Sequence, residues 1–243
     1  MQFPIEWQSA CETHTGVRRD INEDSLFISP EIGLWVVADG MGGHDAGDFA
    51  SQAIVNALSQ LPGQDTLSEL LDRVDDRLIE VNDLLRDHAR SHCGGNTVGS
   101  TVVTMLAKGN VGVVLWAGDS RLYRLRAGML EQITRDHNPI VDLLEEGLIS
   151  EHTALSKDTN IITRAVGGQD DLVLDIAVFD VLAEDTFLLC SDGLYRELSH
   201  QEMSDFLEIE SLADSVKGML ELSLERGARD NVSIVVSRPD RLQ

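Results

Sequence analysis

Residues 34–47 read LWVVADGMGGHDAG, an apolar run that passes directly into an aspartate and a glycine-rich loop. The apolar run contains bulky and β-branched residues, which is typical of a buried β-strand. The loop lacks the G-x-G-x-x-G spacing of dinucleotide sites and the Gly-Lys-Ser/Thr of a P-loop. Asp39 at the loop entrance would repel a pyrophosphate, so we expect the glycines to bring backbone carbonyls close to a cation.

Three further apolar runs carry a carboxylate at one end. Residues 111–117 precede Asp119, residues 187–190 precede Asp192, and residues 232–236 follow Asp230. Each aspartate taken alone indicates an ordinary turn. If the four strand ends share one rim, the crowded carboxylates would repel one another unless cations neutralised them. Carboxylates without clustered His or Cys favour Mg²⁺ or Mn²⁺ over Zn²⁺.

A second charged cluster lies at residues 16–24, GVRRDINED. Such a stretch is typical of a solvated turn. The alternative is that one arginine binds an anion beside the metals, because a guanidinium matches phosphate with two parallel hydrogen bonds. Both interpretations stay open from the residue pattern alone.

Short apolar runs and amphipathic helices define the expected architecture. We expect helices over about 46–58, 67–85, 138–146 and 212–224, from apolar residues at three- and four-residue steps. Runs at 101–106 and 111–117 flank a Gly-Asn turn, and 122–125 and 129–133 follow, which predicts an antiparallel meander. Later strands are expected at 173–181, 186–190 and 232–236. Helices between groups of antiparallel strands indicate a layered α+β fold.

Composition narrows the class of protein. The net charge is −23, which disfavours general nucleic-acid or membrane-surface binding. Three cysteines, Cys11, Cys93 and Cys190, show no C-x-x-C spacing, which indicates a reducing compartment and no thiolate zinc site. No signal peptide and no apolar run of membrane-spanning length is seen. We expect one domain over residues 1–243, monomeric and cytoplasmic.

An ordered set of motifs resembles the metal-dependent protein phosphatases of the bacterial PP2C-like (PPM) type, from about residue 8 to 237. The motifs are Arg19 with Asn22-Glu23-Asp24, residues 37–44, Gly99-Ser100-Thr101, Gly118-Asp119-Ser120-Arg121, residues 163–167, Ser191-Asp192-Gly193 and Asp230-Asn231. Each motif is weak alone, and the ordered set is specific. The resemblance implies an α-β-β-α sandwich of two antiparallel sheets flanked by helices.

The resemblance also implies a binuclear Mn²⁺ or Mg²⁺ centre and a role for each matching residue. Asp39 would bridge the metals, Asp192 and Asp230 would complete the first site, and the carbonyl of Gly40 would bind the second metal. Asp119, with Asp192, would hold a third, weaker metal. Glu23 and Asp24 would act through metal-bound water. Arg19 would bind the substrate phosphate.

The implied reaction is hydrolysis of phosphoserine or phosphothreonine by a metal-activated bridging hydroxide, without a phosphoenzyme. The catalytic set would be Arg19, Asp39, Asp192 and Asp230. A flap over about 136–165 would influence substrate choice. Met41 stands where some eukaryotic relatives have a histidine, so His44 and His137 are candidates for the general acid. Ser100 and Ala228 replace Thr and Ser of many relatives and are expected to matter little.

Relatives further suggest phosphoprotein substrates and a cognate Ser/Thr kinase, in a signalling or secretion system. Two alternatives stay open. One is a non-catalytic pseudophosphatase that binds phosphoproteins. The complete set of carboxylates argues against it, because a non-catalytic site would be expected to lose metal ligands. The other is a hydrolase of small phosphoesters or nucleotides.

Overall fold

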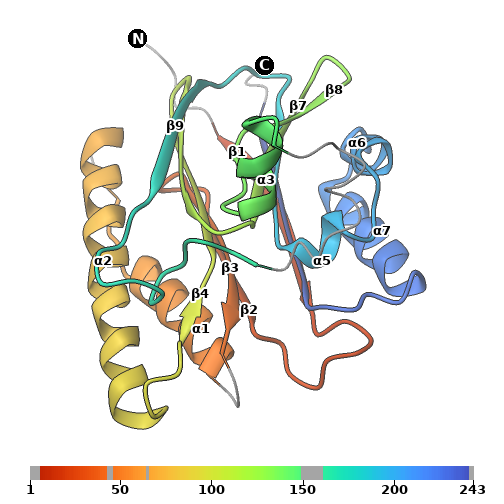
Figure 1. The fold of residues 1–243 in the computed structure, drawn as a ribbon. Coiled ribbons are helices and arrows are strands. Elements are labelled where there is room, and N and C mark those ends of the chain that lie inside the picture. Colours follow the sequence, from red (N-terminus) through yellow and green to blue (C-terminus); the bar gives the residue numbers. More distant parts are fainter. Residues whose placement is uncertain (1–5, 43–45, 64–65, 149–160, 241–243) are drawn as a thin grey trace.

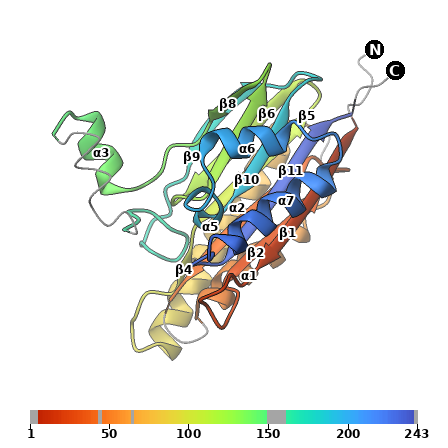
Figure 2. The ribbon, with the colours of Figure 1, turned by 90° about the vertical axis from the view of Figure 1, so that its right-hand side faces the viewer.

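The computed structural model describes residues 6–42, 46–63, 66–148 and 161–240. Two antiparallel sheets form its centre (Figures 1 and 2). One sheet has the order β1 (Trp7–His14), β11 (Val232–Pro239), β10 (Thr186–Cys190), β7 (Arg121–Arg126) and β8 (Met129–Gln132). The other has the order β2 (Asp24–Ser29), β3 (Leu34–Met41), β5 (Val102–Lys108), β6 (Val111–Ala117) and β9 (Asp175–Asp180), with β4 (Gly99–Ser100) pairing with β3.

Helices cover the outer face of each sheet (Figure 2). The helices α1 (Ala46–Ser59) and α2 (Leu67–His92) pack on the sheet that contains β3. The helices α5 (Asp192–Tyr195), α6 (His200–Leu207) and α7 (Leu212–Glu225) pack on the sheet that contains β11. The predicted α-β-β-α sandwich is confirmed.

The alternation of side chains along β3 explains the layering. Leu34 and Val36 belong to the core shared with α1 and α2, whereas Trp35 and Val37 belong to the core between the two sheets. Successive strand residues point to opposite faces, so a strand apolar on both faces needs a cover on each side. This is why the continuous apolar run at 34–38 forms an inner strand.

The helices α1 and α7 lie where the sequence predicts them, and α2 is longer than predicted. It begins with a capping box in which Thr66 and Glu69 bond each other's backbone N–H. It continues past Leu85 to His92, because Ala89 keeps the buried stripe for another turn. The short helix α3 (Pro139–Glu145) falls within the predicted range of 138–146.

The predicted meander is wrong in one respect. The strands β5 and β6 form a hairpin in one sheet, but β7 and β8 form theirs in the other. The chain crosses between the sheets at Gly118, whose φ of 110° is open to glycine and costly for other residues. This crossing places Asp119 at the rim between the sheets.

Five elements were not predicted: β1, β2, β4, α5 and α6. The strand β1 reads WQSACETH and is half-buried or exposed along its length, so it carries no apolar run. Its eight residues nevertheless pair in register with β11. The strand β3 is also longer than predicted and contains Asp39 and Gly40.

Further predictions concern membrane-spanning segments, the cysteines, the flap and the number of domains. Among the described residues, every helix is too short or too polar to span a membrane. Cys11, Cys93 and Cys190 are free thiols. Within the predicted flap, residues 149–160 lie outside the described residues. The single domain over 1–243 stays a prediction.

Candidate metal-dependent active site

A cleft of about 260 Å³ lies at one end of the sandwich and collects most of the predicted site residues. It is lined by Arg19, Glu23, Asp39, Gly40, Met41, Gly42, Thr101, Asp119, Ile162, Asp192, Arg196 and Asp230. These residues come from segments up to 211 positions apart in sequence, as for Arg19 and Asp230. The structure therefore brings the four predicted strand-end carboxylates together.

Asp24 lies behind the cleft, next to Asp39. The two aspartates are directly opposite each other in the β2–β3 pair. Asp24 is 6% exposed, and its Oδ2 accepts a hydrogen bond of 2.7 Å from the Ser191 hydroxyl. Ser191 immediately precedes Asp192, so this bond ties β2 to the start of α5, which carries another predicted ligand.

The backbone around Asp39 is held on both sides. Its N–H donates to the Thr101 hydroxyl at 3.1 Å, and its carbonyl accepts from Thr101 N–H at 2.8 Å. The Ser100 hydroxyl also donates to that carbonyl. Ser100 thus supplies a second hydroxyl that holds the backbone at Asp39.

Gly40 meets its neighbours too closely for any side chain. A Cβ at Gly40 would lie 2.0 Å from the carbonyl oxygen of Gly47 and 2.6 Å from that of Glu23. Gly40 N–H donates to the same Glu23 carbonyl at 3.0 Å. This close approach lets β3, α1 and the 15–23 loop share the edge of the cleft.

Asn231 organises the loop that carries Arg19 and Glu23. Its side-chain amide donates to the carbonyls of Thr15 and Ile21 at 2.8 and 3.0 Å, and its Oδ1 accepts from Glu23 N–H at 2.8 Å. Arg19 then reaches Asp230, with 2.8 Å between Nη2 and Oδ2. Half of the Arg19 side chain is exposed, so its guanidinium faces solvent at the cleft rim.

The carboxylates raise one another's pKa values. Burial raises the pKa of Asp39 well above its usual range, and the charges of Asp24 and Asp192 add to this effect. Burial raises the pKa of Asp24 to about 6. Burial also raises the pKa of Asp192 to about 7, although Arg196 opposes that change. Concentrated negative charge of this kind is unfavourable without a cation.

The donor set fits hard divalent cations. Among the described residues, Asp24 Oδ1 and Asp192 Oδ1 are buried carboxylate oxygens without a hydrogen-bond partner. Oxygen donors of this type favour Mg²⁺ or Mn²⁺. In the described part of the chain, no three His, Cys, Asp or Glu side chains are grouped as a ready-made metal site. Asp230 and Asp192 instead bond Arg19 and Arg196.

The two histidines proposed as general acids have different outcomes. His44 lies outside the described residues. His137 is 3% exposed, its Nδ1 accepts from Gly118 N–H at 3.1 Å, and its Nε2 lies 3.1 Å from Asp175 Oδ2. Since Nδ1 accepts, Nε2 carries the proton and donates to Asp175. Both ring nitrogens are therefore engaged away from the cleft, and the structure does not support His137 as the acid.

The two ends of the predicted flap meet at Asp175. His137 bonds Asp175 Oδ2, and Arg164 bonds Asp175 Oδ1 at 2.5 Å. Thr163 N–H also donates to the His137 carbonyl at 2.8 Å. Through its bond to Gly118, His137 links this junction to the residue before Asp119.

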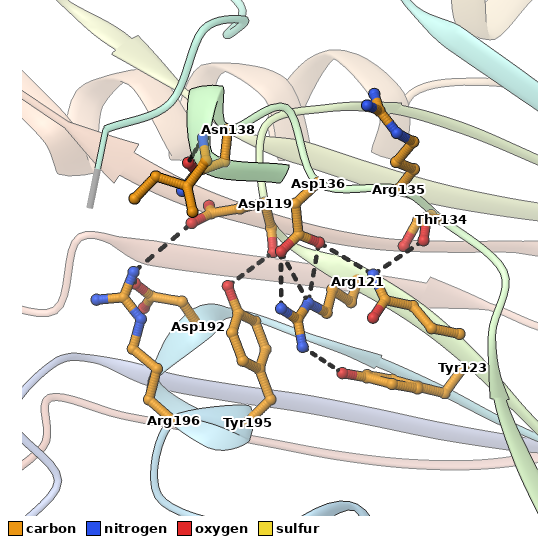
Figure 3. Close-up of polar contacts among 12 residues, drawn as sticks. Asp119, Arg121, Tyr123, Thr134, Arg135, Asp136, Asn138, Asp192, Tyr195 and Arg196 are labelled. Atoms are coloured by element: carbon orange, nitrogen blue, oxygen red, sulfur yellow. Dashed lines mark hydrogen bonds and ion pairs between the residues drawn. The ribbon is translucent and has the colours of Figure 1, made fainter. Parts of the chain in front are cut away.

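A network of buried charges supports Asp119 (Figure 3). The Tyr195 hydroxyl donates to the Asp119 carbonyl at 3.0 Å. The Arg121 guanidinium lies 3.5 Å from the centre of the Tyr195 ring and forms a two-pronged ion pair with Asp136. Arg121 also bonds the hydroxyl of Tyr123. These contacts fix the backbone at Asp119 independently of its carboxylate.

Arg196 is a cleft residue that the sequence analysis missed. It lies one helical turn after Asp192, and its Nη2 is 2.9 Å from Asp192 Oδ2. The spacing of four residues was the available signal, but it has meaning only if residues 192–195 are helical. So short a helix shows no periodicity in sequence.

Known proteins share this fold and are similar in sequence. A family model described as protein phosphatase 2C matches residues 14–233. The chain belongs to the protein phosphatase 2C family. Among its curated relatives, the serine/threonine protein phosphatase PstP of Mycobacterium tuberculosis is 34% identical over 94% of this chain. The chain spans 44% of the length of that relative.

Solved structures agree with the phosphatase 2C assignment. PppA, described as a key regulatory component of T6SS in Pseudomonas aeruginosa, matches with a TM-score of 0.89 and 42% identity, over 97% of this chain and 99% of that one. The catalytic domain of PstP, solved in complex with two manganese ions, matches with a TM-score of 0.84 and 33% identity, over 96% and 98%. The prediction that the family uses divalent cations such as Mn²⁺ is thereby confirmed. The roles of individual residues stay predictions.

Proposed function

We propose that this chain is a protein serine/threonine phosphatase that hydrolyses phosphoserine and phosphothreonine with the help of divalent cations. One observation carries the proposal: Asp39, Asp119, Asp192 and Asp230, each in or next to an end of a different strand, line a single cleft with Arg19 at its rim. Membership of the phosphatase 2C family supports the same reaction.

The residues would divide the work as follows. Asp39, Asp192, Asp230 and the carbonyl of Gly40 would hold the cations, and Glu23 and Asp24 would act from behind them through water. Cations bound there would acidify water and polarise the phosphoryl group, which is the chemistry that this acidic cleft lacks by itself. The chain's own task is to keep these oxygens in place, through Thr101, Ser100 and Ser191.

Arg19 would bind the substrate phosphate. Its guanidinium is held near the cleft by Asp230, and half of its side chain is exposed. A guanidinium offers several N–H donors in a fixed fork, so it can bind a phosphoryl oxygen while remaining close to a carboxylate. Its positive charge would also stabilise the negative charge on the phosphoryl oxygens as the leaving group departs.

A cysteine-based mechanism is disfavoured. Cys190 is the thiol next to the Ser191-Asp192 segment, and it is fully buried in β10. Burial raises the pKa of its thiol, so the nucleophilic thiolate is not formed near neutral pH. Direct attack by water is therefore the better supported route.

The decisive experiment compares wild type with Asp39→Asn on phosphoserine and phosphothreonine peptides, with Mn²⁺, without it and with EDTA. We expect wild-type turnover only with Mn²⁺, and a loss of about a thousandfold or more in the variant. Turnover in EDTA would contradict the proposal. Failure of wild type to hydrolyse p-nitrophenyl phosphate with Mn²⁺ would favour the phosphoprotein-binding alternative. Preference for small phosphoesters in competition with the peptides would favour the alternative of a small-phosphoester hydrolase.

The physiological substrates are a further part of the proposal. We expect them to be phosphoproteins made by a cognate Ser/Thr kinase. The similarity to PppA, over nearly the full length of both chains, supports a role in T6SS regulation. Phosphoproteome comparison of cells with and without this chain would test it. Unchanged Ser/Thr phosphorylation would contradict it.

A further inference from the structure

Arg196 forms a fixed positive charge inside the acidic cleft (Figure 3). Its Nη2 lies 2.9 Å from Asp192 Oδ2 and 3.7 Å from Asp119 Oδ2. The two carboxylate side chains are 11% and 7% exposed, and the Arg196 side chain is 27% exposed. One guanidinium thus faces two largely buried carboxylates.

The helical turn of α5 directs this guanidinium toward Asp192. Arg196 N–H donates to the Asp192 carbonyl at 3.1 Å and closes the single turn of α5. Residues four apart on a helix lie on the same face, so the Arg196 side chain is directed back to Asp192. Arg19 differs in this respect, because it reaches Asp230 from a loop and its side chain is half exposed.

The two oxygens of Asp192 have separate environments. Oδ2 bonds Arg196, whereas Oδ1 is buried and has no hydrogen-bond partner among the described residues. Oδ1 is therefore the oxygen left for a cation of the binuclear centre. The carboxylate oxygen Oδ2 of Asp119 faces the same guanidinium nitrogen of Arg196 as Asp192 Oδ2 does.

The pair formed by Asp119 and Asp192 is the one for which the family resemblance implies a third, weaker metal. A divalent ion placed between these carboxylates would lie about 4 Å from a fixed guanidinium, and like charges at that distance repel strongly in a partly buried site. The residues present therefore do not fit a third metal.

We propose that Arg196 is the counter-charge of Asp119 and Asp192, and that it takes the place of a third divalent ion in this chain. The proposal rests on the proposed function, because it concerns the cations of the same cleft. Arg196 acts through the carboxylates and is a positioning residue.

The test counts bound Mn²⁺ by electron paramagnetic resonance of the free ion, without any activity measurement. We expect wild type to saturate at two ions. Arg196→Met should bind a third ion with a dissociation constant of about 1 mM or below, in the range of weak carboxylate sites. At the Mn²⁺ concentration that fills this third site in Arg196→Met, wild type should still bind only two ions. The double variant Arg196→Met with Asp119→Asn should return to two.

Controls keep the test decisive. Arg77→Met removes an exposed arginine of α2 and should leave two ions bound. Wild type and Asp119→Asn should bind equal numbers, a comparison that does not depend on the folding of an Arg196 variant. A third ion bound by wild type and lost in Asp119→Asn would overturn the proposal, and so would a folded Arg196→Met that binds only two. Absence of both tight ions from wild type would contradict the proposed function itself.

Discussion

Asp24 and Asp39 lie directly opposite each other in the antiparallel pair of β2 and β3. Opposite residues share a face of the sheet, and two like charges in this arrangement destabilise the pair. Asp39 also lies near the charges of Asp192, Asp119 and Asp230. The folded chain thus carries an electrostatic cost at this end of the sandwich, which protons or divalent cations can offset.

We expect the metal-free protein to be more stable at about pH 5 than at about pH 7.5. The folded-state pKa values of Asp24 and Asp192, about 6 and about 7, exceed the ordinary value of 3.8, so the folded state binds more protons in this interval. Stability then falls as pH rises through the folded pKa values. Thermal unfolding in EDTA should show a fall in Tm of about 5 °C. A Tm that rises over this range would contradict the expectation.

Saturating Mn²⁺ should remove this dependence. A cation that binds only the folded state stabilises it by mass action. Protons compete less with the cation for the carboxylates as pH rises, so the cation binds more tightly at higher pH. Unfolding curves with Mn²⁺ should therefore show a larger gain in Tm at about pH 7.5 than at about pH 5. An equal gain at both values would indicate that Mn²⁺ binds away from these carboxylates.

Asp24→Asn should stabilise the metal-free protein while weakening Mn²⁺ binding. The variant removes a buried charge opposite Asp39, and its amide oxygen can still accept from Ser191. We expect a gain of about 1 to 2 kcal/mol in the free energy of unfolding near neutral pH, measured in urea with EDTA. Asp76→Asn, on the exposed face of α2, is the matched control and should change neither quantity.

Gly40→Ala should abolish the folded cleft. The added Cβ would lie 2.0 Å from the Gly47 carbonyl oxygen, a backbone atom that cannot turn aside as a flexible side chain could. We expect a loss of about 3 kcal/mol or more in stability. Gly94→Ala is the control, since a Cβ there has nothing within 4 Å and only its φ of 62° is unfavourable. Near-equal urea midpoints for the two variants would show that the close approach is unimportant.

Asp185→Ala should destabilise the fold without changing the Mn²⁺ count. Asp185 is fully buried, forms a two-pronged ion pair with Arg126 and accepts from Leu182 N–H. Removing one partner of such a pair costs about 3 kcal/mol. Asp180→Ala removes an exposed partner of the same arginine and should have little effect. A change in Mn²⁺ stoichiometry in Asp185→Ala would contradict the separation of fold and site.

The apolar strands were well predicted because each contains a nearly continuous run of buried residues, as in residues 34–38 and 186–190. The sequence predicted the gathering of carboxylates for a related reason, since each follows or precedes such a strand. It missed β1, which has no apolar run of its own and pairs in register along β11. It also treated β5 to β8 as one meander, because the crossing at Gly118 depends on a backbone angle that composition does not reveal.

The site was less predictable wherever it depends on short-range geometry. Arg196 reaches Asp192 only because residues 192–195 form one helical turn. His137 carried a plausible chemical role in sequence, and the structure gives it two structural bonds instead. In both cases the deciding quantity is a side-chain direction, which a local helical turn sets for Arg196 and partners 19 and 38 residues away set for His137.

The junction at Asp175 has an evolutionary consequence. His137 and Arg164, near the two ends of the predicted flap, are both bonded to one carboxylate, and His137 also accepts from Gly118 N–H beside Asp119. If the predicted flap influences substrate choice, its sequence can diverge between relatives while these anchoring bonds keep the carboxylate cleft constant.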